Sequence, residues 1–238
     1  MRVRITGADD QLTHALNSVD GSVETVGEAS DTGPAELLIA VGEAALEDCA
    51  AHRERRPILP VGFDAAWSPA VEELPALLEE FVESDITVED ATVDVRPLVV
   101  SVDGRRSIAV FDTTLITSEP ARISEYGVSV DRQEHATFRA DGVVVATPVG
   151  SHGYGRAAGG PQLAFGTGVA VVPIAPFATI ADTWVLKPPL SVSVERGDPV
   201  TVFADTTEVA TGRSELCVAV TTGRPLSLVD GRRLADSP

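Results

Sequence analysis

Hydrophobic and polar residues alternate in two different ways along this chain, and the change divides it into two regions. In the first third, short apolar runs alternate with segments whose apolar positions recur at helical spacing. The expected elements are a strand over residues 1–6, a helix over 9–18, a strand over 36–41, a helix over 43–52 and a strand over 57–61. Such an alternation predicts a small parallel α/β layer.

A further helix is predicted after residue 67. Ser68 and Pro69 have the order of an N-cap followed by a proline in the first turn. Pro75 is expected either to delay the start of this helix or to kink it. The apolar residues that follow at near-helical spacing are interpreted as core: Val71, Leu74, Leu77, Leu78, Phe81 and Val82.

Beyond Asp85 the pattern changes to short alternating runs separated by turn residues. Asp103-Gly104, Gly127, Asp198-Pro199 and Gly223 mark the turns, and helical periodicity is confined mainly to the residues after Ser151. This second region is expected to be mostly antiparallel β-sheet. The chain therefore predicts an α/β domain over residues 1–84 and a β-rich domain over residues 85–238.

The segment 141–161, DGVVVATPVGSHGYGRAAGGP, carries the clearest candidate chemistry. Three consecutive valines indicate a strand, Pro148 ends it, and several glycines follow. We expect Ser151 to cap a short helix whose free N–H groups and positive dipole end face phosphate or ribose oxygens. Glycine-rich turns are common, so this pattern taken alone is a weak indication of a nucleotide site.

The order of residues in this segment resembles the NAD kinase signature, an Asp-Gly, an apolar strand, the sequence TPTGSTAY and a small-residue helix ending in Gly-Gly-Pro. The matching residues are Asp141, Gly142, Thr147, Pro148, Gly150, Ser151, Tyr154, Gly159, Gly160 and Pro161. The departures are Val149 and His152 for Thr, Gly153 for Ala, Gly155 and Ala157 for Ser, and Arg156 for an apolar residue.

Looser resemblances extend over about residues 35–219. Residues 37–46 stand where the family has an apolar strand followed by GGDGT, and Asp112-Thr113 stands at its Asn-Glu pair. Residues 171–177 resemble its TPICPH segment, and Asp205 stands for a later Asp-Gly. The resemblance implies a Rossmann-like α/β domain followed by a β-sandwich.

The resemblance also implies a reaction, transfer of the γ-phosphate of ATP, or of polyphosphate, to the 2′-hydroxyl of the adenosine ribose of NAD, with Mg²⁺. Glu43 then takes the place of the family's general base, and Gly42 and Arg156 contact phosphate. Ala44 and Ala45 replace the glycine and threonine of GGDGT. From residue type alone, Glu43 is equally well explained as a first-turn helix acid.

The implied NAD-binding residues are Asp112, Asp141, Thr147, Gly150, Ser151, His152, Gly153 and Tyr154. Each has a structural alternative: Asp141 as a turn residue, Tyr154 as a half-buried aromatic, His152 as a neutral loop histidine. Arg156 alternatively pairs with a surface acid. Asp112 keeps an acceptor for the adenine amino group but lacks an amide donor, and Thr113 cannot replace a glutamate unless Glu119 or Glu125 compensates.

Composition restricts the remaining function classes. The formal charge is −18, the sequence pI is about 4.5, and Lys187 is the only lysine, a balance typical of a halophile's acidic surface and unlike that of a nucleic-acid binder. Cys49 and Cys217 are expected to be reduced and buried, and His14, His52 and His135 have no companions at metal spacing. No P-loop, signal-peptide core or membrane-length apolar run is found, which predicts a cytoplasmic protein without membrane partners.

Three functions stay open at this point. The first is an NAD kinase; the second is a catalytically impaired paralogue that binds NAD(P) or a nucleotide as a sensor or partner. The third is a small-molecule kinase with a different acceptor, because the substitutions in the glycine-rich segment alter its pocket. The resemblance implies a homo-oligomer, a dimer or tetramer. The polar end, residues 230–238, is predicted to be a frayed tail without a role.

Overall fold

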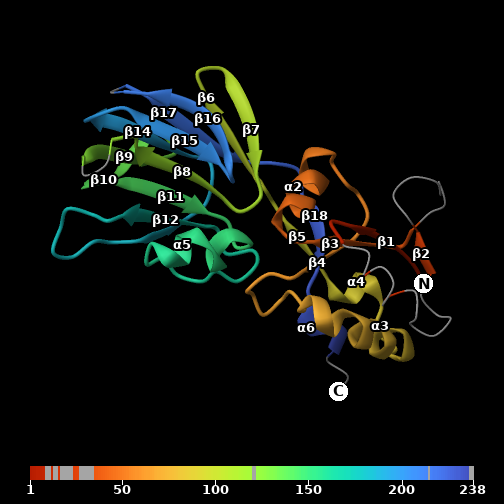
Figure 1. The fold of residues 1–238 in the computed structure, drawn as a ribbon. Helices are drawn as coiled ribbons and strands as arrows, with labels where there is room; N and C mark the ends of the chain where they lie inside the picture. The colour runs from red at the N-terminus through yellow and green to blue at the C-terminus, as the bar shows by residue number, and fades with distance from the viewer. Residues whose placement is uncertain are drawn as a thin grey trace. The chain divides into compact units, whose positions relative to one another are not determined.

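The computed structural model describes residues 1–8, 12, 16, 24–26, 35–119, 122–213 and 215–235. It divides the chain into two compact units (Figure 1). The first contains Met1–Val95 and the segment from Leu226 onward, and the second contains Arg96–Pro225. The sequence pattern placed the division after residue 84; the structure places it after Val95, because the chain first adds a strand to the first sheet.

The first unit is built on a six-stranded sheet with the order β2-β1-β3-β4-β18-β5. Neighbouring strands are parallel except β5, which runs antiparallel to β18. The strands are β1 Arg2–Thr6, β2 Glu24–Val26, β3 Leu37–Val41, β4 Ile58–Val61, β5 Thr92–Val95 and β18 Leu226–Val229. The two central strands β3 and β4 are almost wholly buried, as expected for parallel strands covered on both faces.

The helices of this unit are α2 Glu43–Ala51, the 3₁₀ turn η1 Val71–Glu73, α3 Leu74–Glu83, α4 Val88–Ala91 and α6 Gly231–Ala235. Helix α2 confirms the helix expected over 43–52. Of the helix expected over 9–18, Leu12 and Leu16 are helical and buried, and the other positions lie outside the described residues. These leucines join Leu74, Leu78 and Phe81 in the core beside the sheet.

The helix predicted from Ser68 and Pro69 begins later than expected. Ser68 is not its cap: the hydroxyl donates to the Pro60 carbonyl at 3.0 Å and accepts the Phe63 N–H at 3.1 Å, which fixes the loop after β4. A 3₁₀ turn follows, and α3 starts at Leu74 with Pro75 in its first turn, where the missing N–H is harmless. Pro75 therefore sets the start of the helix and does not kink it.

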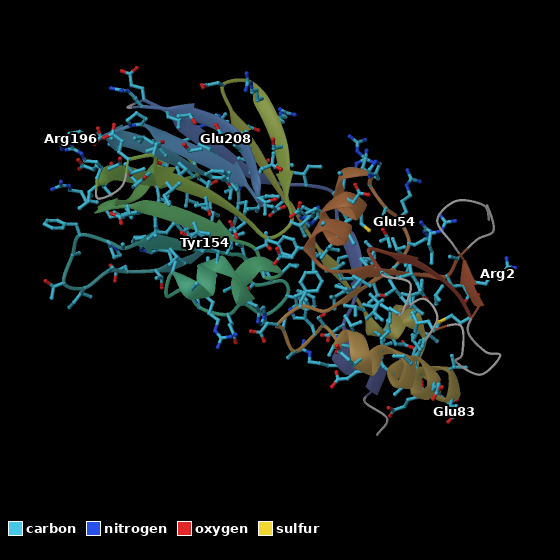
Figure 2. All side chains as sticks on the ribbon, viewed as in Figure 1. Arg2, Glu54, Glu83, Tyr154, Arg196 and Glu208 are labelled. Atoms are coloured by element: carbon cyan, nitrogen blue, oxygen red, sulfur yellow. The ribbon has the colours of Figure 1, made fainter. Side chains whose placement is uncertain are left out.

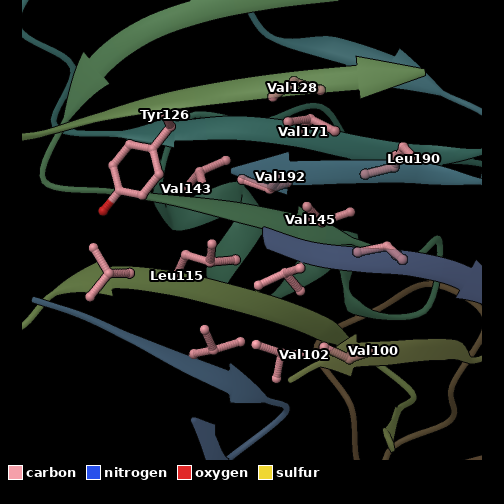
Figure 3. Close-up of a cluster of buried hydrophobic side chains, with 14 of the residues drawn as sticks. Val100, Val102, Leu115, Tyr126, Val128, Val143, Val145, Val171, Leu190 and Val192 are labelled. Carbon is pink, nitrogen blue, oxygen red and sulfur yellow. The ribbon is translucent and has the colours of Figure 1, made fainter. Parts of the chain in front are cut away.

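The second unit contains two six-stranded sheets in which every pairing is antiparallel, with the orders β10-β9-β14-β17-β6-β7 and β13-β12-β11-β8-β15-β16. The strands are β6 Leu98–Val102, β7 Arg105–Ala109, β8 Asp112–Thr117, β9 Ser124–Val130, β10 Gln133–Ala140, β11 Gly142–Ala146, β12 Val169–Ile174, β13 Trp184–Leu186, β14 Leu190–Arg196, β15 Val200–Ala204, β16 Thr207–Gly212 and β17 Cys217–Thr222. Both sheets contribute to one apolar core (Figure 3), in which Val100, Val128 and Val192 of the first meet Leu115 and Val143 of the second. The predicted class, an α/β layer followed by a β-sandwich, is confirmed.

Two expectations for the C-terminal part were wrong. Residues 230–235 pack into the first unit: the Asp230 N–H donates to the Ala91 carbonyl at 2.9 Å, and Leu234 is 1% exposed in its core. Residues 236–238 lie outside the described residues. Polarity suggested a tail, but this segment is held by the buried Leu234 and by two backbone hydrogen bonds, from the Asp230 N–H to Ala91 and from the Gly231 N–H to the Trp67 carbonyl at 2.8 Å. Cys217 is exposed, because it points outward from the first position of β17, whereas Cys49 is buried as expected.

No helix among the described residues is long and apolar enough to cross a membrane.

Candidate functional site

The glycine-rich segment forms a compact turn after β11 at one end of the second unit. β11 ends at Ala146, the 3₁₀ turn η2 spans Gly150–His152, and the short helix α5 spans Tyr154–Ala157. All five residues of β11 are buried, so the turn is anchored to the middle of a sheet. The turn therefore has a rigid base, as a binding loop on a scaffold requires.

Thr147 fixes this turn to the segment that precedes β8. Its hydroxyl donates to the Val110 carbonyl at 2.7 Å and accepts the Gly150 N–H at 3.1 Å. Its own N–H donates to the Phe111 carbonyl at 2.8 Å. Thr147 is 1% exposed, so these three bonds lie away from water. Thr147 thus joins two segments that are almost 40 residues apart in the sequence.

Gly150 is required at its position by a close approach of two backbones. A Cβ on this residue would lie 2.1 Å from the Phe111 carbonyl oxygen and 2.6 Å from the Phe111 Cα. Backbone atoms at such distances cannot move aside cheaply, so no other residue fits without displacing the turn. The glycine predicted to bind NAD is therefore also the point where the turn touches residue 111.

Ser151 does not cap a helix, and the expectation that it does was wrong. It lies inside η2, where its hydroxyl donates to the Pro148 carbonyl and accepts the Leu163 N–H, both at 2.9 Å. The side chain is 1% exposed. Its hydroxyl links the start of the glycine-rich segment to the loop behind it, which local sequence could not indicate because Leu163 is twelve residues away.

The expected helix N-terminus is also smaller than predicted. Helix α5 has only four residues and no side-chain cap, so its dipole is weak. The Gly150 N–H bonds to Thr147, and the Gly153 N–H donates to the Gly150 carbonyl at 3.0 Å. These two amides are already used within the protein, which limits the number of N–H groups left for a phosphate.

Four of the predicted site residues reach the surface of the turn. His152 is half-buried, whereas Gly153 and Arg156 are exposed. Tyr154, labelled in Figure 2, is 43% exposed at the start of α5. The signature thus separates into residues that build the turn, Thr147, Gly150 and Ser151, and residues whose side chains or backbone remain accessible to a ligand.

Asp112 lies beside the turn, at the first position of β8. The register pairs it with Ala146, directly before Thr147. Its carboxylate accepts the Thr114 hydroxyl at 2.9 Å, and the residue is 9% exposed. Thr113 is fully buried, and its hydroxyl donates to the Phe203 carbonyl at 2.7 Å. Of the two residues at this position, Asp112 carries the ionisable group, whereas Thr113 forms a hydrogen bond between β8 and β15.

Asp205 completes this end of the unit, from the turn between β15 and β16. Its carboxylate accepts three consecutive backbone N–H groups, those of Val110 at 2.7 Å, Phe111 at 2.8 Å and Asp112 at 3.0 Å. Its own N–H donates to the Asp112 carbonyl at 2.8 Å. In the sequence Asp205 stood only as the counterpart of a later Asp-Gly in the resemblance, and no local pattern indicated that its side chain holds a distant segment.

Asp141 lies at the opposite end of β11 from Thr147 and is therefore distant from Asp112 and the glycine-rich turn. It precedes Gly142, which pairs with Ile116 at the far end of β8, whereas Thr147 follows Ala146 at the near end. The five residues of β11, at ~3.3 Å per residue, place roughly 16 Å of strand between them. The Asp141 carbonyl accepts the Thr117 N–H at 2.8 Å and, at 3.4 Å, the hydroxyl of Tyr126, whose pKa is raised by burial.

Gly42 and Glu43 lie in the first unit, directly after β3. Gly42 has φ = 79°, a left-handed conformation that favours glycine, and its N–H donates to the Val61 carbonyl at 3.0 Å. Glu43 is the first residue of α2 and is the acid in its first turn. Both alternatives for Glu43, helix-end acid and general base, agree with a position at the carboxyl end of a parallel strand.

Histidine, cysteine and carboxylate side chains form no group of three or more that could hold a metal ion within the described part of the chain. Mg²⁺ in nucleotide sites is commonly held by substrate phosphates and waters with one or two carboxylates.

Comparison with known proteins gives consistent results. Residues 112–227 match the family model of the ATP-NAD kinase C-terminal domain. The NAD kinase of Methanosarcina barkeri is 30% identical over 174 residues, which cover 69% of this chain and 60% of that protein. The NAD kinase of Corynebacterium glutamicum is 30% identical over 210 residues, which cover 82% of this chain and 70% of that protein. The chain thus spans about 60% of the length of the archaeal relative and somewhat more of the bacterial one.

Two solved structures share the fold. A crystal structure of an NAD kinase from Archaeoglobus fulgidus in complex with ATP has a TM-score of 0.69 at 20% identity, covering 98% of this chain and 95% of that chain. Yeast NADH kinase complexed with NADH has a TM-score of 0.71 at 15% identity, covering 96% of this chain and 83% of that chain. At these identities the likeness establishes the fold alone.

Proposed function

The chain belongs to the NAD kinase family, and from this premise we propose that it transfers the γ-phosphate of ATP to the 2′-hydroxyl of the adenosine ribose of NAD, giving NADP. The observation that carries the proposal is the junction of the signature turn with residues 110–112 through Thr147 and Gly150. A binding loop fixed in this way is preorganised, which lowers the entropy cost of binding a dinucleotide.

The accessible residues of the turn supply the proposed contacts to NAD. Tyr154 offers a ring face to a base, and Arg156 offers a planar guanidinium to a phosphate. Asp112 offers an acceptor to the adenine amino group. We propose that Thr147, Gly150 and Ser151 contribute by shaping the turn and that His152 and Gly153 line it. Asp141 is proposed as an NAD contact that acts at a separate position on the sheet.

Catalysis in this proposal depends on Glu43 in the first unit. A carboxylate that accepts the proton of the 2′-hydroxyl would activate it toward the γ-phosphate. The N–H groups after Gly42 and the guanidinium of Arg156 offset phosphate charge. When bound with ATP, Mg²⁺ would neutralise phosphate charge further.

A second function, a paralogue that binds NAD(P) without turnover, is favoured by one observation. Thr113 stands where the family has a glutamate, and its hydroxyl is committed to the Phe203 carbonyl inside the sheet. Glu125, a possible substitute, forms an ion pair with Arg196 at 2.8 Å. The third function, a kinase with a different acceptor, is kept because Val149, His152, Gly153 and Ala157 change the signature.

One experiment separates these functions. Purified protein in molar salt is incubated with NAD, ATP and Mg²⁺, NADP is measured, and NAD and NADP binding are measured by calorimetry. The proposed kinase forms NADP, and Glu43→Gln lowers kcat on the order of 100-fold or more while NAD binding persists. Glu72→Gln, an exposed acid of η1, is the matched control and keeps wild-type activity.

The other outcomes have distinct meanings. Binding of NAD or NADP without NADP formation would establish the paralogue. Absence of binding to either dinucleotide would contradict both and leave a kinase with another acceptor. Repeating the assay with polyphosphate in place of ATP, and measuring NADP again, shows which of the two is the phosphate donor. EDTA should stop turnover and leave NAD binding in place, because the metal is proposed to arrive with the phosphate donor.

We infer two further properties from family membership. The protein is proposed to form a dimer or tetramer, which light scattering after size-exclusion chromatography in molar salt measures directly. It is also proposed to act in the cytoplasm, where NAD and ATP are available; fractionation of the source cells tests this location.

A further inference from the structure

Three consecutive N–H groups at the start of β8 converge on a single carboxylate. The Asp205 Oδ1 accepts the Phe111 and Asp112 N–H groups, and Oδ2 accepts the Val110 N–H. Successive amides aimed at one point form a concave anion site that commonly holds a phosphate. Here the protein fills that site with its own side chain, so the three amides serve to fix the backbone of residues 110–112.

The backbone of residues 110–112 contacts the signature turn and also carries Asp112, the two parts of the proposed adenine site. Its carbonyls at Val110 and Phe111 accept the two Thr147 hydrogen bonds, and the Phe111 carbonyl lies against Gly150. Its last residue, Asp112, carries the carboxylate proposed to meet adenine. Residues 110–112 are thus bound through their N–H groups by Asp205 and through their carbonyls by the signature turn.

A second two-residue hairpin turn in the second unit also begins with an aspartate of positive φ and allows a comparison with Asp205. Asp131 begins the two-residue turn between β9 and β10 with φ = 51°, and Asp205 begins the two-residue turn between β15 and β16 with φ = 50°. Asp131 is exposed, whereas Asp205 is half-buried against residues 110–112. The first turn residue has a positive φ in both turns, whereas the second differs, because Arg132 has φ = 66° and Thr206 does not have a positive φ. The capture of three distant amides distinguishes Asp205.

We propose that Asp205 is a positioning residue of the nucleotide site, which holds residues 110–112 in the conformation that presents Asp112 to the adenine base. This inference rests on the proposed NAD binding and assigns the adenine preference to a side chain that does not itself contact the ligand. Hydrogen bonds to a charged acceptor are the stronger class, so the carboxylate is the suitable group for this task.

The test compares two dinucleotides and two matched variants. Nicotinamide hypoxanthine dinucleotide carries a carbonyl oxygen where NAD carries the adenine amino group, so it presents an acceptor to Asp112 at the position where NAD presents a donor. We expect wild-type protein to bind NAD roughly 10-fold more tightly than this analogue. Asp205→Asn leaves at least one of the three amides without an acceptor, and we expect it to weaken NAD binding roughly 10-fold and to reduce the preference for NAD.

Asp131→Asn is the control and should keep both affinities and the preference. A loss of general stability would weaken the two dinucleotides equally, so a change in their ratio is the readout specific to positioning. Unchanged affinities and ratio in Asp205→Asn would overturn the inference while leaving NAD binding intact. Wild-type protein that binds no dinucleotide would overturn the proposed function, and this inference with it.

Hydrogen exchange of the wild-type protein gives a measurement that does not depend on a variant folding. If Asp205 preforms the segment, the amides of Val110, Phe111 and Asp112 should be protected to the same degree with and without NAD. Protection that arises only after NAD is added would show that the ligand orders the segment, and would overturn the positioning role of Asp205.

Discussion

The Thr147 side chain belongs to the signature, yet its hydrogen bonds are made within the protein. Its hydroxyl donates to Val110 and accepts from Gly150, and it is almost fully buried. Ser151 behaves in the same way toward Pro148 and Leu163. Residues that resemblance alone would place against NAD thus fix the shape of the turn, and the side chains of His152, Tyr154 and Arg156 are the ones that remain accessible to a ligand.

The first prediction concerns the Thr147 hydroxyl. Thr147→Val keeps the shape of the side chain but leaves the Gly150 N–H without its acceptor, so we expect the free energy of unfolding to fall by about 2 kcal/mol. NAD binding should weaken as well, because the turn loses an anchor.

Thr167→Val is the control for the Thr147 measurement. The Thr167 hydroxyl is exposed and donates to the Ala164 carbonyl, so the loss of unfolding free energy should stay within about 0.5 kcal/mol. Urea unfolding in molar salt measures both; equal losses would show that burial of the Thr147 bonds is unimportant.

The second prediction concerns the pair Glu54 and Arg56 after α2. The Arg56 side chain donates to the Glu54 carboxylate at 2.9 Å and lowers the pKa of Glu54 from 4.5 to about 2. A folded-state pKa below the unfolded one adds stability above the unfolded value, and this contribution disappears as the pH falls from about 4.5 to about 2. The difference in stability between wild type and Glu54→Gln should therefore shrink over that range.

Glu79→Gln, on the exposed side of α3, is the control for the Glu54 measurement. Thermal unfolding of the three proteins at a series of pH values in constant salt gives the comparison. A gap between wild type and Glu54→Gln that stays constant down to pH 2 would contradict the assigned ion pair.

At the scale of elements, short local patterns identified β1, β3, β4, α2 and α3 in the first unit, but not which sheet the later strands β5 and β18 join. The sequence predicted β5 and β18 to belong to the β-rich domain. In the structure they pair with each other, and β18 also pairs with β4, so both strands extend the sheet of the first unit. Four residues carry too little pattern to select one sheet over another, so the choice depends on where the chain has already folded. Helix α6 was expected to be a tail for a different reason: its sequence is mostly polar, and its single buried leucine, Leu234, is too weak a local pattern to predict packing.

The third prediction concerns α6. Leu234 is buried among the apolar residues of the first unit, so Leu234→Ala removes packed methyl groups and should lower the free energy of unfolding by about 2–3 kcal/mol. Ile180→Ala removes methyl groups from a side chain that is 86% exposed and should change it by less than about 0.5 kcal/mol. Denaturant unfolding measures both. A frayed C-terminal segment would instead make the two substitutions equally harmless.

At the scale of the whole molecule, the charge of −18 is the dominant property. Self-repulsion among acids destabilises the folded chain at low salt, and the screening length falls from about 10 Å at 0.1 M to about 3 Å at 1 M salt. The fourth prediction is that the thermal midpoint rises steeply between 0.1 M and 1 M KCl. Replacing Glu79, Glu80 and Glu83, three exposed acids of α3, by Gln should raise the midpoint at low salt and flatten the dependence. An unchanged slope in this variant would show that salt acts by a route other than charge screening.

The sequence by itself determined the class of fold, the main elements of the first third of the chain, the acidic character and the family signature, because periodicity, turn residues and motif order are local properties. It also placed Asp112 and Thr147 in the two segments that meet. Tertiary structure decided which side chains face inward: Ser151 bonds to Leu163, Asp205 captures residues 110–112, and Asp141 lies at the far end of β11. These facts follow from strand register and from hydrogen bonds between residues as many as 95 positions apart, which no local pattern encodes.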